Sequence, residues 1–150
     1  MIDATISGKS IQEVNRRLDR FQAAMEDTTQ PNRQASIAMY GWLIRNYDRE
    51  GALIGGWAPL HPKTVAEKKE LGKERMLVRS GALRQSYVPF YTKENAGVGS
   101  ELIYSKPHQE GNPARNLPAR PMLPSREVVL DIGIRVYGDY VRRQVKVANA

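Results

Sequence analysis

The 150-residue chain has the length and apolar content of one compact domain, with 41% hydrophobic and 26% charged residues. It contains no cysteine, which excludes disulfides, thiolate metal sites and cysteine nucleophiles, and its formal net charge is +7. Neither a secretory signal nor a segment with the ~20 apolar residues of a membrane-spanning helix is visible. We therefore expect one domain, residues 1–150, made in the cytoplasm and without a membrane partner.

Two amphipathic helices are predicted in the N-terminal third. Apolar residues spaced three and four apart predict a helix over residues 10–25, with Ser10 and Glu13 forming a capping box at its start. A polar break follows, and a second helix is predicted over residues 33–48. Because Trp42 widens its apolar surface beyond one stripe, we expect the second helix to be buried on two sides or to contact another subunit.

The middle of the chain is predicted to combine loops with a small antiparallel sheet. Glycines predict a loop over residues 51–60, and a short charged helix is expected over residues 64–71. Runs of β-forming residues then predict two or three antiparallel strands between residues 84 and 104. Since Pro89 has no backbone N–H to donate, its strand is expected at a sheet edge or at a bulge.

The C-terminal third is predicted to contain a long loop and a long helix. Five prolines between residues 107 and 124 predict an extended loop, and loops of that length are usually functional. Two adjacent apolar stripes predict a final helix over residues 125–147 that buries about half of its circumference. The predicted fold class is α+β, a small antiparallel sheet packed by the N-terminal and C-terminal helices, with long loops.

The sequence offers no motif for catalysis or for a cofactor. The two histidines, His61 and His108, lack a second ligand at a spacing that would form a metal site. No nucleophile elbow, phosphate loop or dinucleotide-binding glycine pattern occurs. A metal-dependent enzyme using Asp48, Glu50 or His108 is one rival hypothesis, but any chain with 16 acidic residues offers such groups. We predict no enzyme, no catalytic residue, no cofactor and no metal.

The positive charge supports one alternative function. Short basic clusters at residues 68–69 and 142–143 could contact an acidic partner, so a basic nucleic-acid-binding protein is the main alternative. Each cluster is also compatible with the solvated face of a helix. Duplex affinity that falls steeply with salt would distinguish the alternative.

Several short motifs occur in order between residues 57 and 123. They are Trp57-Ala58-Pro59-Leu60, Thr64, Lys68, Leu77-Val78-Arg79-Ser80-Gly81-Ala82-Leu83, Val98-Gly99, Tyr104, His108-Gln109-x-Gly111 and Pro118-Ala119-Arg120-Pro121-Met122-Leu123. In this order and spacing they resemble the phage virion morphogenesis family, which includes Mu-like protein G and the tail completion protein S. The pattern is also similar to that of head–tail joining and tail terminator proteins. The flanking helices agree with the family in kind and approximate length.

The resemblance implies a structural role in the virion, at the head–tail junction of the tail or neck. Copies would form a ring, as a hexamer, that terminates or completes the tail and joins it to the head connector. The implied partners are the protein itself, the tail tube and the connector proteins, with possible non-specific contact to genomic DNA in the lumen. The protein would be made in the host cytoplasm.

The loops over residues 51–60 and 107–123 are the predicted interfaces of this ring, since a closed ring needs two different contact patches. The side chain of Arg120, held between two prolines, is expected to point either toward a carboxylate inside the fold or toward a neighbouring subunit. The predicted interface residues are Trp57, Leu60, His108, Arg115, Arg120 and Met122.

Overall fold

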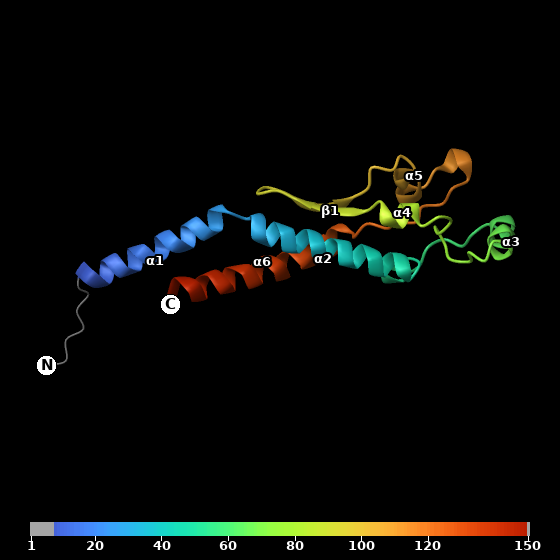
Figure 1. The fold of residues 1–150 in the computed structure, drawn as a ribbon. Helices are drawn as coiled ribbons and strands as arrows, with labels where there is room; N and C mark the ends of the chain where they lie inside the picture. Colours follow the sequence, from blue (N-terminus) through green and yellow to red (C-terminus); the bar gives the residue numbers. More distant parts are fainter. Residues whose placement is uncertain (1–7, 150) are drawn as a thin grey trace.

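The computed structural model describes residues 8–149, which form an elongated, mostly helical α+β fold with one two-stranded antiparallel sheet (Figure 1). The predicted fold class is confirmed. No helix in this range combines the length and apolar character needed to cross a lipid bilayer. The elements in chain order are α1 (Gly8–Glu26), α2 (Thr29–Asp48), the 3₁₀ turn η1 (Ala52–Ile54), α3 (Pro62–Glu70), α4 (Ala82–Gln85), β1 (Val88–Tyr91), β2 (Ala96–Gly99), α5 (Ser105–Glu110), the 3₁₀ turn η2 (Pro113–Arg115) and α6 (Arg126–Asn149).

The first two helices begin earlier than predicted. Helix α1 extends from Gly8 to Glu26, so Ser10 lies inside the helix and the predicted capping box is wrong. Helix α2 begins at Thr29 rather than at residue 33, because a proline in the first helical turn, here Pro31, loses no helical hydrogen bond. The carboxylate of Asp27 accepts a hydrogen bond of 3.0 Å from the backbone N–H of Thr29, one of the free donors at that helix start.

The sheet contains two strands, and the possible third strand does not form. Strands β1 and β2 pair from Val88 with Gly99 to Tyr91 with Ala96, so Pro89 lies on an edge strand as predicted. The chain after β2 instead forms a turn, in which Ser100 Oγ accepts the backbone N–H of Leu102, and leads into α5. The sheet is therefore shorter than the predicted range of residues 84–104.

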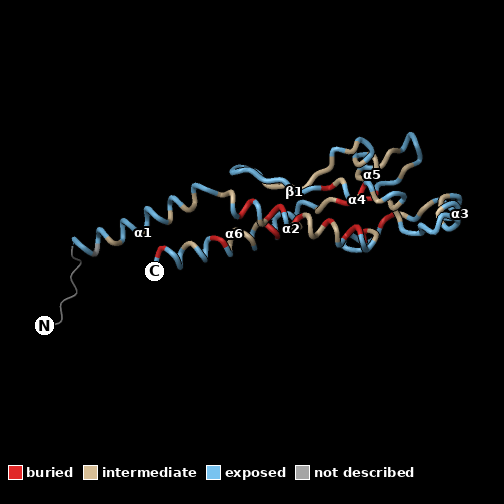
Figure 2. The backbone as a smooth tube through the Cα atoms, viewed as in Figure 1, coloured by how far each residue is buried: buried red, intermediate tan, exposed pale blue. Residues whose placement is uncertain are grey.

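Helix α2 carries the core on two of its sides, which confirms one of the two expectations for it. One side packs against the sheet and the other against α6, as Figures 1 and 2 show. Its last two turns contribute to a cluster of buried residues around Tyr47, whose hydroxyl donates to the carbonyl of Leu77 at 2.7 Å. Burial raises the pKa of Tyr47 to about 12. This main cluster comprises Leu43, Tyr47, Trp57, Leu83, Tyr87 and Met122, and a second contains Ala35, Met39 and Ile132.

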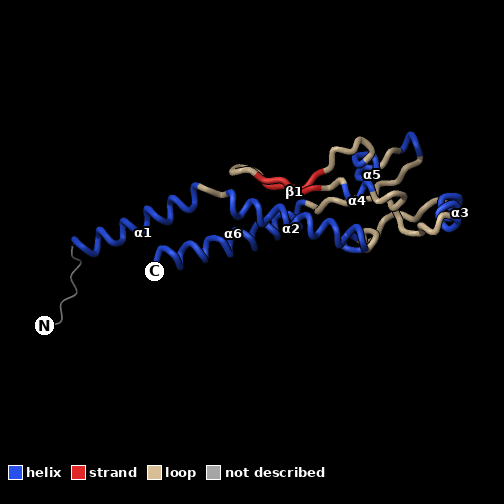
Figure 3. Tube along the Cα trace, in the orientation of Figure 1, coloured by secondary structure: helices blue, strands red, loops and turns tan. Residues whose placement is uncertain are grey.

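The segment from residue 107 to 124 is not one extended loop. It contains the last residues of α5 and the turn η2, with irregular chain between and after them (Figure 3). Pro107 is tolerated because it lies in the first turn of α5, where helical N–H groups have no partner. The prediction of an extended loop is therefore wrong for the residues of α5 and η2.

Helix α6 confirms the predicted final helix but not its predicted burial. It runs back beside α2 and then beside α1, where the hydroxyl of Tyr140 donates to the carbonyl of Ala24 at 2.7 Å (Figure 1). Only Ile132, Tyr140 and Ala148 are buried along it. The helix therefore leaves most of its circumference exposed, against the expectation that half would be buried.

Candidate functional site

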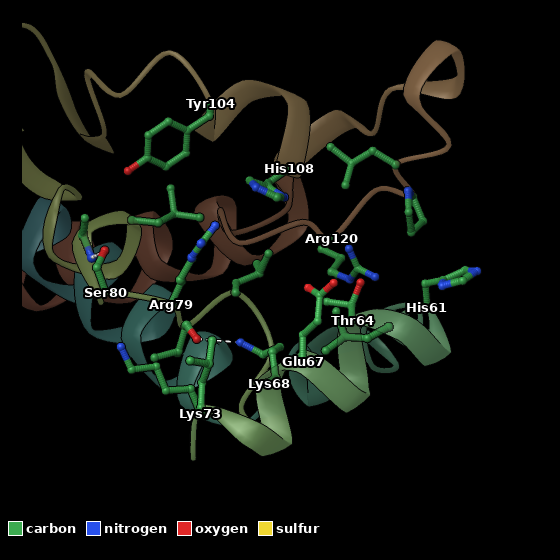
Figure 4. A pocket seen from close by; sticks show the side chains of 18 of the residues that line it. His61, Thr64, Glu67, Lys68, Lys73, Arg79, Ser80, Tyr104, His108 and Arg120 are labelled. Carbon is green, nitrogen blue, oxygen red and sulfur yellow. Dashed lines mark hydrogen bonds between the residues drawn. The ribbon is translucent and has the colours of Figure 1, made fainter.

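A cavity of about 700 Å³ lies between α3, the chain before and within α4, α5 and residues 116–120 (Figure 4). Cavities of this size are typical of sites that bind small molecules or peptide segments. The predicted interface loops, residues 51–60 and 107–123, meet beside it. Leu60, His108 and Arg120 line the cavity.

Arg120 holds these two loops together. Its side chain is only 4% exposed, and its Nε and Nη2 atoms donate to the carbonyl oxygens of Ala58 and Pro59, each at 3.0 Å. Its backbone N–H donates to the carbonyl oxygen of His108 at 2.7 Å. Arg120 therefore points inside the fold, which was one of the two expected directions. Its partners there are carbonyl groups and not the expected carboxylate.

Trp57 and Met122 lie beneath the cavity in the main core cluster. The indole N–H of Trp57 donates to the carbonyl oxygen of Pro121 at 2.7 Å, and its ring meets the ring of Tyr47 edge-on, with centroids 5.4 Å apart. Gln109 fixes the chain of Met122 by accepting its backbone N–H at 2.7 Å. Both predicted interface side chains are therefore buried within one chain, with exposed fractions of 6% for Trp57 and 0% for Met122.

The remaining predicted interface residues differ in their positions. Leu60 is half-buried on the cavity wall, and His108 on α5 is half-buried with an Nδ1 atom that is enclosed and has no hydrogen-bond partner among the described residues. Burial, and then the nearby charge of Arg120, lower the pKa of His108 below its ordinary value. Arg115 is exposed in η2 and does not line the cavity.

Several of the motifs that carried the family resemblance line the cavity or fix the chain beside it. Gly111, with a φ angle of +81°, lets the chain pass so close to residue 119 that an added Cβ would lie 2.8 Å from its backbone nitrogen. Gln109 also holds this segment by accepting the backbone N–H of Met122, and Arg120 ties it to the carbonyl oxygen of Ala58. The motifs therefore specify internal contacts, which explains why the chain needs these residue types in this order.

The charged side chains that line the cavity are predominantly cationic. Four basic side chains line it, those of Lys68, Lys73, Arg79 and Arg120, whereas Glu67 is the one carboxylate among its lining residues. Lys68 donates to the carbonyl oxygen of Val78 at 2.6 Å, and burial followed by the charge of Lys73 lowers its pKa. In the sequence, Lys68 belongs to a basic cluster compatible with a solvated helix face and Arg79 belongs to one of the family motifs, and neither pattern predicts a cavity. The fold brings these residues together from separate segments, and no spacing along the chain signals that.

The acidic residues of the rival enzyme hypothesis are engaged elsewhere. Asp48 accepts two hydrogen bonds of 3.1 Å from Arg84, which lower the pKa of its carboxyl, with a further contribution from Arg75. Glu50 accepts the backbone N–H of Met76 at 2.7 Å. Between residues 8 and 149, no group of three or more histidine or acidic residues is placed to hold a metal ion.

The outer face of the sheet is apolar and exposed. The side chains of Val88 and Phe90 are 55% and 51% exposed, and across the ladder they face Gly99 and Gly97. The Phe90 ring covers Gly97 so closely that an added Cβ would lie 2.4 Å from its Cζ atom. A solvated sheet face normally carries polar side chains, so this sheet face, made of Val88, Phe90, Gly97 and Gly99, has the composition of a contact surface.

Two helices also expose apolar side chains in rows. The α1 stripe consists of Ile11, Val14 and Leu18, each more than half exposed. The α6 stripe consists of Leu130, Ile134, Val141 and Val145. Single exposed apolar residues are ordinary, but rows at helical spacing are typical of surfaces that bind another helix or sheet.

Taken together, a tightly anchored scaffold, a cationic cavity and exposed apolar surfaces are typical of a protein that binds other macromolecules. The sequence model of the phage virion morphogenesis family matches residues 9–136. The chain belongs to this family of phage structural proteins, and the predicted resemblance is confirmed. The match runs from α1 into α6, well beyond residues 57–123. Comparisons with curated proteins and with solved structures gave no match.

Proposed function

We propose that this protein is a structural component of the head–tail junction of a phage virion, where it completes or terminates the tail and joins it to the head connector. The family match over residues 9–136 carries the proposal. In this role the protein assembles in the virion after synthesis in the host cytoplasm, and it performs no catalysis. Its partners are further copies of itself, the tail tube and the connector proteins.

The exposed apolar surfaces support assembly into a homo-oligomeric ring, with six copies as the working stoichiometry. A closed ring requires two different patches, one from each neighbour, at every contact. The sheet face and the α6 stripe are two such patches on separate elements. We assign the ring contact to them, with the sheet face of one copy packed against the α6 stripe of the next.

The position of this contact differs from the interface expected from sequence. Trp57, Arg120 and Met122 are 6%, 4% and 0% exposed within one chain, which leaves them little surface to offer a neighbour. Leu60, His108 and Arg115 keep accessible surface, so they remain candidates for a contact with the tail tube or the connector.

Cryo-electron microscopy of the purified protein mixed with tail tubes tests the proposal. The expected result is a symmetric ring at the head-proximal end of the tube, and the image would also count its copies. A protein that stays monomeric and leaves the tubes undecorated would contradict the ring and the completion role together.

Nucleic-acid binding remains the second candidate, favoured by the net charge of +7. The basic residues of α3 and those of α6, including Arg142 and Arg143, lie toward opposite ends of the elongated molecule (Figure 1). Arg142 is also paired with Asp139 on the same helix. A salt titration of duplex binding separates the candidates, because a dedicated DNA-binding protein would lose affinity steeply as salt rises. Non-specific contact with DNA inside the ring would instead be weak.

A further inference from the structure

The buried guanidinium of Arg120 lacks a counter-ion. Its side chain is 4% exposed, yet within residues 8–149 no carboxylate oxygen lies within the 4.0 Å of an ion pair. Two of its nitrogens donate to carbonyl oxygens, and Nη1 makes no hydrogen bond to another described residue. Buried charges are normally paired, because removing an ion from water without a partner is costly.

Neighbouring basic side chains add further positive charge that no carboxylate among the described residues balances. Lys68, Lys73 and Arg79 line the same cavity, and the first of them has a pKa lowered by burial and by its basic neighbours. Glu67 also lines the cavity, but among the described residues its carboxylate forms no ion pair with Arg120 within 4.0 Å. The cavity therefore has an excess of positive charge in a partly open hollow, where a bound anion would be stabilised.

The rest of the lining favours a peptide over a nucleic acid. Leucines at positions 60, 77, 83 and 117 supply apolar wall, together with Val78. A cavity of about 700 Å³ can hold one acidic side chain and an apolar neighbour. Nucleic-acid backbones are instead bound in open grooves, with aromatic side chains under the bases, and this lining has no Phe or Trp and a single Tyr, Tyr104.

We propose that this cavity binds a carboxylate-bearing peptide segment, an aspartate or glutamate flanked by an apolar residue, from a neighbouring protein in the virion. Arg120 pairs with the carboxylate, Arg79 and Lys73 provide further charge, and the leucines receive the adjoining side chain. That the segment comes from the virion rests on the proposed function. The site itself is a property of the single chain, so it can be tested without a ring.

The test is a nuclear magnetic resonance titration of the full-length, nitrogen-15-labelled protein with the peptide N-acetyl-Leu-Asp-Leu-amide. The expected result is saturable shifts of the Arg120 Nε–H and of the backbone at residues 79 and 108. The matched peptide with asparagine in place of aspartate should produce no saturation. Equal effects of the two peptides, or no saturable shift with either, would overturn the proposal.

Charge variants make the test independent of Arg120 itself, whose replacement would release the loop at Ala58 and could unfold the protein. The exposed cations are the better targets, and Arg79→Gln or Lys73→Gln should each weaken peptide binding about twofold to fivefold, the range of partly solvated charge pairs. Glu67→Gln removes the resident carboxylate and should strengthen binding. Lys69→Gln on the same helix does not touch the cavity and should leave affinity unchanged. Equal affinities across these variants would overturn the charge assignment.

Two further ligands distinguish a peptide site from other anion sites. Inorganic phosphate and a short single-stranded oligonucleotide should each displace the aspartate peptide only weakly, and tighter binding of either would overturn the peptide assignment. Peptide binding by a protein that forms no ring would retain this inference and reject the proposed function. A ring that forms although the protein binds no peptide would retain the proposed function and reject this inference.

Discussion

At the scale of single residues, Gly51 makes room for the side chain of Trp57, a role that the glycine-rich sequence around it does not indicate. It has a φ angle of +82°, and a Cβ there would lie 2.3 Å from Cδ1 of Trp57. The indole cannot retreat, because it is buried and donates to the carbonyl of Pro121. Gly51 therefore lets the tryptophan close the core beneath the cavity.

Replacing Gly51 by alanine should be more damaging than the same change at Gly55. Both glycines have positive φ angles, which cost an alanine about 1–2 kcal/mol, but nothing lies within 4 Å of a Cβ at Gly55. Overpacking against Trp57 should add about 1–3 kcal/mol at Gly51. Urea unfolding of the two variants measures the difference, and equal stabilities would contradict the close approach.

His108 should make the stability of the protein sensitive to mild acid. Burial and Arg120 lower its pKa in the folded state, whereas in the unfolded chain it titrates near its ordinary value of 6.5. Below that pH the unfolded chain binds more protons than the folded protein, so the free energy of unfolding falls. The loss continues until the pH reaches the lowered pKa of the folded state.

The variant His108→Gln isolates this effect, because it removes the titrating ring and keeps a polar side chain. Its free energy of unfolding should change less than that of the parent protein between pH 7 and pH 5. Urea unfolding at a series of pH values measures both profiles. Parallel profiles would show that His108 does not link protonation to folding.

At the scale of elements, Asn32 connects three parts of the fold. It is 3% exposed at the start of α2, and its Nδ2 donates to the carbonyls of Thr92 and Lys93, both at 2.9 Å. Its Oδ1 accepts the hydroxyl of Tyr137 on α6. One amide group thus fixes the turn of the hairpin and a helix against α2.

Asn32→Ala should destabilise the protein by about 2–3 kcal/mol, because it leaves several buried polar groups without partners. Asn15→Ala is the matched control, since Asn15 is exposed on α1 and its loss should change stability by less than about 0.5 kcal/mol. Thermal and urea unfolding measure both variants. A cost for Asn32→Ala as small as that of the control would reject the proposed connection.

The sequence predicts elements better than it predicts burial. Apolar spacing indicated all three long helices, and Pro89 correctly indicated an edge strand. The same spacing could not show whether the α6 stripe faces the interior or a partner, since both surfaces have one apolar row. It could not place the cationic cavity, because Lys68 and Arg120 meet only through tertiary folding.

Residue type also gave an ambiguous indication of the interface. Trp57 and Met122 have the side chains expected at an interface, but large apolar side chains in a loop suit a core equally well. The fold buries both within one chain. For the exposed Phe90, the sequence predicted a strand but not an interface. Alternation identifies which residues share a sheet face, but it does not show whether that face is covered.

At the scale of the whole molecule, the proposed ring contact predicts how defective copies combine. Phe90→Glu disables the sheet face and Ile134→Glu disables the α6 stripe, where the isoleucine is 73% exposed. Each variant alone should remain monomeric, since every neighbour contact lacks one patch. Mixed together, they retain one intact pair of patches and should form a two-chain complex that cannot close into a ring.

Light scattering after size-exclusion chromatography measures the mass of each sample. The control Gln12→Glu adds the same charge to an exposed polar position on α1 and should assemble as the parent protein does. Unfolding curves of both variants exclude loss of the fold as the cause of a monomer. If each variant assembles alone, these patches do not form the contact. If the mixture stays monomeric although both are folded, the patches do not meet each other, and the contact joins like surfaces or involves other residues.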